Sequence, residues 1–394
     1  MKKAIVVSFY KSNNIGDLAL SKSIKDIVLK SGYEVTSYDF GTIEKVKDET
    51  NNLNTNKMPD KCYSKIIHNI YNLVKYFIGD HLFGYLAVIS KRKKWKAFIL
   101  DLMESDVIVI GGGNMLLDKQ IYWPSLLYKY SSLAKGKGKK SFLVYVGAEK
   151  VTSRISHLFF KKALNKFDYV SVRDPESLRI CQEITKSPIE ETIDPVFQLK
   201  PPENNFFGIT DELNIGICVL SSVCFKDNIG FKKYLDSLEK MIFFLSEHKS
   251  FKIDSFYLFS TDAADFYIVD QLKKRIDIQS KNITVKVTKP TTLSNVINLY
   301  SQFTYLIGGR MHSMIIAQKC LLPYCGVIWQ SKIRGFSKVV EREKRIFELS
   351  EFINHQYIAG LIIQDLKNIE VIKRYMSIKN SNLESTLDKT NFLK

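Results

Sequence analysis

The sequence of 394 residues has few of the residues from which metal sites and disulfide frameworks are built. It contains six cysteines and six histidines, no CxxC pair, and no histidine at ligand spacing from a cysteine. Some cysteines, such as Cys218 and Cys325, lie inside apolar runs, as is typical of buried free thiols in a reducing compartment. We therefore expect neither a metal site nor a disulfide framework.

Long apolar runs are also lacking. The longest apolar region, Ile66–Ile89, is interrupted by charged residues and by histidines. It falls short of the ~20 uninterrupted apolar residues that a membrane-spanning helix needs. No signal peptide precedes the first apolar segment, which follows Met1-Lys2-Lys3 directly. We expect a cytoplasmic protein that can make peripheral contact with the inner face of the plasma membrane.

Signatures of nucleotide and nucleic-acid binding are missing as well. The chain has no GxGxxG or P-loop pattern and no helix-turn-helix, RNA-binding or zinc-finger pattern. The net charge is nevertheless +17, with the cations spread among acidic residues along the whole chain. Such a charge favours an anionic partner: a phosphorylated metabolite, an acidic membrane surface or nucleic acid. We expect no nucleic acid partner.

Short apolar segments alternate with segments of helical spacing, a pattern typical of parallel α/β sheets. Pro201–Asn205 is the best linker signal and divides the alternation into two similar halves. The sequence therefore predicts two Rossmann-like, doubly wound domains facing a cleft, at residues 1–200 and 201–345, with a helical extension at 346–394. The predicted strands are Ala4–Phe9, Tyr33–Tyr38, Asp106–Ile110, Ser141–Val146, Tyr169–Val172, Asn214–Leu220, Ile253–Ser260, Ile283–Val287, Phe303–Ile307 and Pro323–Trp329.

Residues 41–103 form an insertion within the first half. Gly41–Ser64 is polar and is predicted to be a loop, whereas Lys65–Met103 combines aromatic residues with the basic run Lys91-Arg92-Lys93-Lys94. One interpretation is helical core with a solvated basic face. The other is an amphipathic hairpin that rests on anionic lipid.

The stretch around which the candidate site is organised is Gly308-Gly309-Arg310-Met311-His312. It joins a predicted strand to a predicted helix, so unpaired N–H groups of the helix, a guanidinium and an imidazole meet at one turn. This combination favours a small anion such as phosphate or carboxylate. The alternative is a structural turn with a surface ion pair at Arg310 and a core histidine at His312.

Other predicted strands end in residues of similar chemistry. Asn14 and Asp17 follow the first strand, and Arg173 ends the fifth. Asp17 is either a helix cap or a catalytic carboxylate, and Arg173 either faces the crevice or pairs with Asp174. The third strand leads into the glycine-rich turn Gly111-Gly112-Gly113-Asn114, whose backbone N–H groups can approach a ligand. In open α/β sheets these carboxyl ends are where ligands bind.

Several of these pieces occur in an order that resembles the polysaccharide pyruvyl transferase family. The pieces are Asn13-Asn14-Ile15-Gly16-Asp17, Gly111-Gly112-Gly113 with Asp118, Ser171-Val172-Arg173-Asp174 with Ser177, Asp194-Pro195, Gly309-Arg310-Met311-His312, and Lys332-Ile333-Arg334-Gly335-Phe336. The usual Arg-Leu-His of the family reads Arg-Met-His here, and Gln330-Ser331 stands where Tyr-Asp is common. The resemblance extends from the first strand to about Phe336.

The resemblance implies a GT-B-like fold and transfer of the carboxyvinyl group of phosphoenolpyruvate onto a sugar as a pyruvate ketal, with release of phosphate. The expected phosphoenolpyruvate site comprises Arg173, Gly309, Arg310, Met311 and His312. His312 is the candidate acid or a phosphate ligand, and Asp17 is the candidate base. No cofactor is expected besides this donor.

The acceptor would be a saccharide or lipid-linked oligosaccharide that is a precursor of a capsular or other cell-surface polysaccharide. Candidate residues for binding the acceptor or phosphate are Asn14, Gly112, Gly113, Asn114 and Lys332. Two alternatives stay open: a GT-B glycosyltransferase that uses a nucleotide sugar, and a non-catalytic anion-binding protein.

Overall fold

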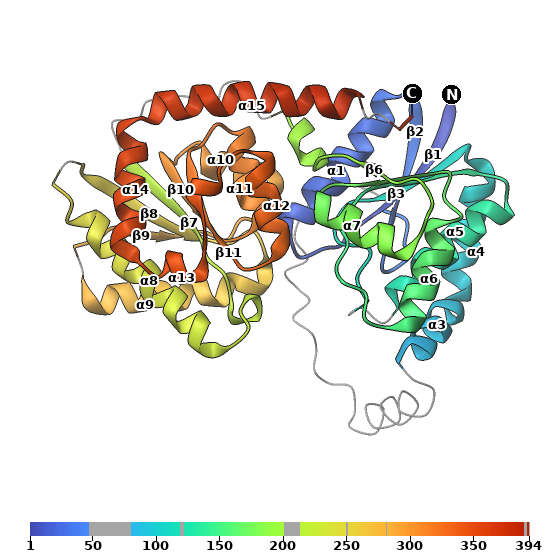
Figure 1. Ribbon diagram of the computed structural model, residues 1–394, viewed down its shortest axis with the longest axis horizontal. Coiled ribbons are helices and arrows are strands. Elements are labelled where there is room, and N and C mark those ends of the chain that lie inside the picture. The colour runs from blue at the N-terminus through green and yellow to red at the C-terminus, as the bar shows by residue number, and fades with distance from the viewer. Residues whose placement is uncertain are drawn as a thin grey trace.

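The computed structural model describes residues 1–46, 80–118, 122–200, 213–249, 251–280, 282–389 and 392–393. Within them, the strands form two parallel six-stranded sheets with helices between consecutive strands (Figure 1). The strand orders are β2-β1-β3-β4-β5-β6 and β12-β11-β10-β7-β8-β9. The predicted fold of two Rossmann-like domains of the GT-B kind is confirmed.

In the first domain, short strands of Val, Ile and other apolar residues are buried on both faces, as a parallel sheet requires. One core lies within this domain, and a second extends from the first sheet across the junction to residues of the second domain such as Met311 and Ile315. The elements are β1 (Lys2–Ser8), α1 (Ile15–Lys30), β2 (Tyr33–Asp39), α3 (Asp80–Ser90), α4 (Arg92–Glu104), β3 (Val107–Gly111), α5 (Trp123–Gly136), β4 (Lys140–Val146), α6 (Arg154–Leu164), β5 (Tyr169–Val172), α7 (Pro175–Ile184), β6 (Glu190–Glu191) and the 3₁₀ helix η1 (Pro195–Gln198).

The second domain repeats the alternation around its own core. Its elements are β7 (Leu213–Cys218), η3 (Ser222–Cys224), α8 (Asn228–Ser246), β8 (Ile253–Phe259), η4 (Ala263–Asp265), α9 (Phe266–Gln279), β9 (Val285–Val287), α10 (Leu293–Tyr300), β10 (Tyr305–Gly308), α11 (Met311–Lys319), β11 (Tyr324–Ile328), α12 (Ser331–Val339), η5 (Glu343–Arg345), β12 (Ile346–Glu348), α13 (Leu349–Phe352), α14 (His355–Lys367) and α15 (Ile369–Lys389). The predicted linker Pro201–Asn205 and residues 47–79 of the predicted insertion lie outside the described residues.

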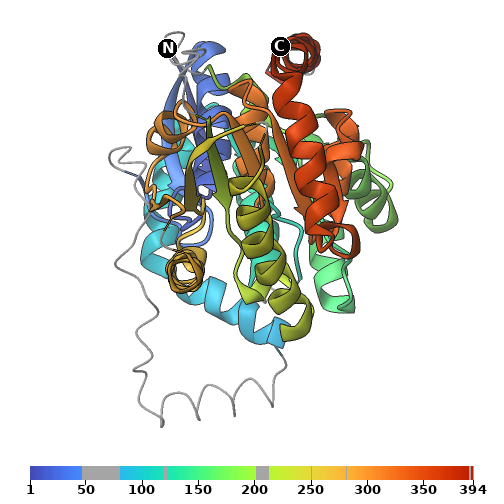
Figure 2. The same cartoon turned by 90° about the vertical axis from the view of Figure 1, so that its left-hand side faces the viewer.

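The segment predicted as a helical extension contributes to both domains. Its first residues form the edge strand β12, which pairs with β11 of the second sheet. Helix α15 then lies across both lobes in Figure 1 and is seen end-on in Figure 2. Asn380 of α15 is bonded to Gln318 of α11, and the ring of Phe392 stacks on Tyr169 of the first domain. The end of the chain thus ties the two domains together.

The loops that follow strands of the two sheets meet at the domain junction. Backbone hydrogen bonds join the β1–α1 loop to the β8–η4 loop, from Ile15 N–H to the Thr261 carbonyl (2.8 Å) and from Ala263 N–H to the Asn13 carbonyl (3.0 Å). Because the β1–α1 loop carries Asn14 and leads into Asp17, which the sequence singles out, the junction is the place to look for a site.

Two further expectations concern the cysteines and membrane-spanning helices. The five cysteines within the described ranges are buried and unpaired, as predicted, and Cys62 lies outside them. No helix in the described part of the chain combines the length and the apolar character needed to cross a bilayer.

Candidate functional site

Arg173, at the end of β5, is buried at the domain junction. Its Nη1 donates to Asp194 Oδ2 at 3.0 Å and its Nη2 to Asn114 Oδ1 at 2.8 Å. The alternative of an ion pair with Asp174 is wrong, because the Asp174 carboxylate instead caps α7 by accepting from Ser177 N–H (2.8 Å). Arg173 therefore faces the crevice, held by an acid and an amide.

Asp194 joins Arg173 to the second domain. Its Oδ2 lies 3.5 Å from His312 Nε2, and its Oδ1 accepts from Val196 N–H (3.0 Å). Burial acts to raise the pKa of this carboxyl, but the His312 contact and the Arg173 charge outweigh it, so the net shift is downward. The Asp194 carboxylate is thus ionised and lies between a guanidinium and an imidazole.

His312, in the first turn of α11, lies against the backbone of Gly16 in the first turn of α1. A Cβ at position 16 would lie 2.1 Å from His312 Nδ1, far inside van der Waals contact. Glycine at position 16 is therefore what lets the imidazole of one domain dock on the other. The His312 side chain is buried at this contact.

Arg310 precedes α11, but its guanidinium is already paired. Its Nε and Nη2 donate to the two carboxylate oxygens of Asp265 at 2.8 and 2.9 Å, and its Nη1 lies 3.3 Å from Asp262. The guanidinium carbon also lies 5.3 Å from the centre of the Trp329 ring. The alternative of a surface ion pair is wrong, because the pair with Asp265 is buried, whereas the expected contact of Arg310 with phosphoenolpyruvate stays a prediction.

Lys332 lies in the first turn of α12, the helix that follows β11, and its side chain reaches the domain junction. Burial and the neighbouring charge of Arg173 lower the pKa of its ammonium group to about 8, although Asp17 and Glu149 act in the opposite direction. With this lowered pKa, Lys332 is a group that changes charge near neutral pH.

Asn14 and Asp17 lie at the start of α1. Asn14 is the N-cap: its Oδ1 accepts from Gly16 N–H (2.8 Å), and its Nδ2 donates to Asp262 Oδ2 across the junction (3.3 Å). Asp17 therefore lies in the first turn, and the alternative that it caps the helix is wrong. It is half-buried and accepts a hydrogen bond from Ser12 (2.8 Å).

The glycine-rich strand ends serve the fold as much as the site. Gly112 and Gly113 have φ of +81° and +71°, which only glycine adopts readily, and the Gly112 N–H is bonded to the Val144 carbonyl. At Gly309, a Cβ would lie 2.3 Å from the Cys218 carbonyl oxygen. At Gly309, the lack of a side chain therefore makes room for the backbone of Cys218.

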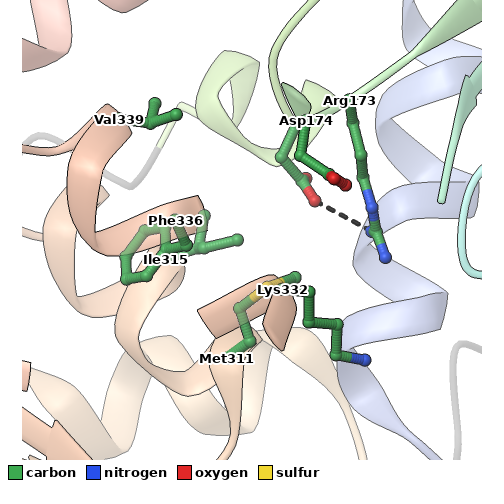
Figure 3. Close-up of a pocket in the computed structure, with 8 residues that line it drawn as sticks. Arg173, Asp174, Met311, Ile315, Lys332, Phe336 and Val339 are labelled. Atoms are coloured by element: carbon green, nitrogen blue, oxygen red, sulfur yellow. Dashed lines mark hydrogen bonds and ion pairs between the residues drawn. The ribbon is translucent and has the colours of Figure 1, made fainter. Parts of the chain in front are cut away.

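Two small cavities flank Lys332. One, shown in Figure 3, has a volume of about 20 Å³, and Arg173, Asp194 and Met311 are among the residues around it. In that view the side chains of Arg173 and Lys332 extend toward the same region beside α1. The second cavity is of the same size and is bordered by Asn114 and Glu149. Each has room for about one water molecule.

The structure therefore gathers most of the predicted residues at one junction. Arg173, Asn114, His312, Arg310, Asn14, Asp17 and Lys332 all border or contact it. Sequence reasoning did not give Asp194, Asp262 or Asp265 a role at the site. Asp194 and Asp262 carry the signature of an ordinary helix cap, whereas Asp265 makes no side-chain cap to α9. In the described residues, no group of three or more His, Cys, Asp or Glu is arranged to hold a metal ion.

A sequence model of one protein family covers most of this chain. The model of the polysaccharide pyruvyl transferase family matches residues 14–317, a range that runs from the N-cap of α1 to the last turn of α11. No curated protein matches the chain significantly.

Among solved structures, the similarity is one of fold. A chain of the Glycosylation Associate Protein (Gap123) complex from Streptococcus agalactiae is 13% identical with a TM-score of 0.50, over 77% of this chain and 57% of that one. This chain thus spans less than two thirds of that relative. UDP-GlcNAc 2-epimerase from Methanocaldococcus jannaschii is 10% identical with a TM-score of 0.51, over 91% and 92% of the two chains.

Proposed function

Because the chain belongs to the polysaccharide pyruvyl transferase family, we propose that it transfers pyruvate from phosphoenolpyruvate onto two hydroxyls of a sugar as a ketal. The observation that carries the proposal is the meeting of Arg173, Lys332 and His312 at the domain junction, with Arg310 behind them. Phosphoenolpyruvate carries a phosphate and a carboxylate on three carbons, and a cluster of cations from two domains suits such a polyanion.

The proposed reaction balances without a redox partner. The vinyl CH₂ of phosphoenolpyruvate takes up a proton and becomes the methyl group, and C2 becomes oxocarbenium-like. One sugar hydroxyl adds to C2 and gives up its proton. A second hydroxyl then displaces phosphate, giving the ketal, and the proton of this hydroxyl is taken up by the leaving phosphate. The reaction needs an acid near the donor and a base near the hydroxyls.

Each residue has a proposed role. Arg173 and Lys332 hold the phosphate and carboxylate, and Arg310 adds positive charge from the second domain, next to Gly309 and Met311. His312 is the acid, oriented by Asp194. Asp17, half-buried near Lys332, is the base. Since the cavities beside Lys332 hold about one water molecule each, entry of the donor requires the two domains to move apart.

The test is release of inorganic phosphate from phosphoenolpyruvate in the presence of a panel of neutral saccharides, with nucleotide sugars as a parallel series. The proposal expects phosphate release that depends on an acceptor. Consumption of a nucleotide sugar instead would favour the glycosyltransferase alternative, and turnover of neither would favour the anion-binding alternative.

His312→Gln separates catalysis from binding in the same assay. Gln keeps a hydrogen-bond donor but is no acid, so we expect kcat to fall by about 10²–10⁴-fold with donor affinity nearly unchanged. A kcat within a few-fold of the parent would remove His312 from the role of the acid.

A further inference from the structure

A cavity of about 480 Å³ lies in the second domain, and the proposed chemistry does not use it. It is bounded by the segment between η3 and α8, by the start of α12, and by the β12–α13 junction. Gln330 and Ser331 border both this cavity and the small cavity that Lys332 and Glu149 line. A molecule bound in the large cavity would therefore lie directly beside the cation cluster.

The large cavity differs from that cluster in charge. Its two cations, Lys226 and Arg334, are matched by two carboxylates, Asp227 and Glu348, and Arg334 Nε donates to Glu348 at 3.1 Å. Burial raises the pKa of the Cys224 thiol to about 12, so this group is neutral. The lining thus has no net charge, which favours an uncharged ligand over the phosphorylated donor.

The lining has the mixture of surfaces that a sugar ring needs. The indole of Trp329 is fixed by a hydrogen bond from its Nε1 to the Gly309 carbonyl (2.9 Å), and Phe225 contributes a second ring. Gln330 Oε1 is buried and has no hydrogen-bond partner among the described residues. A hydroxyl group is the natural donor for it, and fixed aromatic rings with a few convergent polar groups are typical of small-molecule pockets.

We infer that this cavity binds the saccharide acceptor as an uncharged sugar. The sugar lies against Trp329 and donates a hydroxyl proton to Gln330 Oε1, and its reacting hydroxyls project past Ser331 toward Lys332 and the donor. This inference rests on the proposed function for the identity of the reaction. The place and class of the ligand come from the cavity itself.

The experiment titrates neutral disaccharides of hexoses and N-acetylhexosamines, in parallel with UDP and with phosphoenolpyruvate, by ligand-observed NMR. The variant is Gln330→Met, which keeps the size of the side chain and removes the buried acceptor. Gln330 makes no side-chain cap to α12, so the variant should fold. The matched control is Gln302→Met, at an exposed glutamine that does not line this cavity.

We expect at least one disaccharide to bind the parent protein and Gln330→Met to weaken its binding about tenfold, the effect of one lost hydrogen bond. Gln302→Met should bind the disaccharide as the parent does. Gln330→Met should keep the affinity of the parent for phosphoenolpyruvate. The inference would be overturned if both variants bound the saccharide equally, or if the parent bound no saccharide. It would also be overturned if Gln330→Met lost affinity for UDP instead of the saccharide. Failure of the proposed function would be seen separately, as saccharide binding at this cavity without phosphate release.

Discussion

His312 of α11 packs its imidazole directly on Gly16 of α1, so that one residue of each domain forms the contact beside the Asp194 carboxylate. Gly16 has no Cβ, and any other residue would place one 2.1 Å from His312 Nδ1. The orientation of the proposed acid therefore depends on a glycine in the other domain.

The first prediction is that Gly16→Ala is damaging although it lies in a helix. In an ordinary helix this change stabilises by about 0.5–1 kcal/mol. Here we expect a lower melting temperature and a fall in kcat/KM of about 10²-fold or more, because misplacing a catalytic group by about 1 Å has that effect. Thermal unfolding and the phosphate-release assay measure the two effects.

The control for this prediction is Gly360→Ala in α14. A Cβ there would meet nothing within 4 Å, so the variant should be as stable as the parent or slightly more stable. If Gly16→Ala behaved like Gly360→Ala, the contact with His312 would have no part in activity.

This contact also shows where sequence reasoning ends. The alternation of apolar segments predicted both sheets, and the residues at strand ends predicted the junction, since parallel strands place their carboxyl ends together. Partners could not be predicted in the same way. Gly16 meets His312 across 296 positions of the chain, a relation that no local pattern encodes.

Charge pairing escaped prediction for a related reason. Asp194 and Asp262 each accept a backbone N–H two residues ahead, which is the local signature of a cap. Only the tertiary fold brings Arg173 to the first and Arg310 to the second. A capping residue with a further free oxygen is thus easily taken for a purely local feature.

The second prediction concerns the pH dependence of donor binding. With the pKa of Lys332 lowered to about 8 in the free protein, the ammonium is charged below pH 8 and loses its proton as the pH rises through 8. If Lys332 holds the phosphate as a cation, the affinity for phosphoenolpyruvate should fall over pH 7–9. Binding titrations across this range give the profile.

Two variants make the pH profile specific to Lys332. Lys332→Arg keeps the charge at all these pH values and should remove the alkaline fall in affinity. Lys332→Met should bind weakly across the whole range. A parent profile that stays flat between pH 7 and pH 9 would show that the proton of Lys332 does not contribute to binding.

The third prediction is that Arg310 is a structural cation as well as part of the site. Asp265 is fully buried and accepts from Arg310 at both oxygens. Arg310→Met leaves this carboxylate without its countercharge and should lower the free energy of unfolding by about 3–5 kcal/mol. Urea denaturation measures the loss.

The double variant Arg310→Met/Asp265→Asn should recover part of this loss, because it removes the uncompensated charge as well. Arg179→Met, at an exposed ion pair with Glu176, serves as the control and should have little effect. Strict additivity of Arg310→Met and Asp265→Asn would contradict the pairing.

The last prediction concerns the basic run of α4 and a membrane-bound acceptor. The structure divides this run between two faces. Lys91 Nζ donates to the Gly41 carbonyl (3.2 Å) and Lys94 pairs with Glu44 (2.8 Å), so these two face the protein. Lys93 is exposed. Only the outward face can meet a lipid surface.

That outward face continues along the helix. Lys96, Leu100 and Met103 follow Lys93 at intervals of three and four residues, and the two apolar side chains are 57% and 55% exposed. An exposed stripe of cations and large apolar side chains is typical of helices that lie on anionic bilayers. We therefore expect Lys93 and Lys96 to contribute to vesicle binding, and Lys91 and Lys94 to contribute little.

Two double variants test this expectation with the same change in net charge. Lys93→Gln/Lys96→Gln should reduce cosedimentation with phosphatidylserine vesicles about 30-fold, at about 1 kcal/mol for each lysine. Lys91→Gln/Lys94→Gln should reduce it far less, and 0.5 M salt should abolish the difference by screening. Equal losses in the two variants would mean that only the total charge of +17 attracts the protein to the vesicles, and no binding by the parent would reject membrane contact through this face.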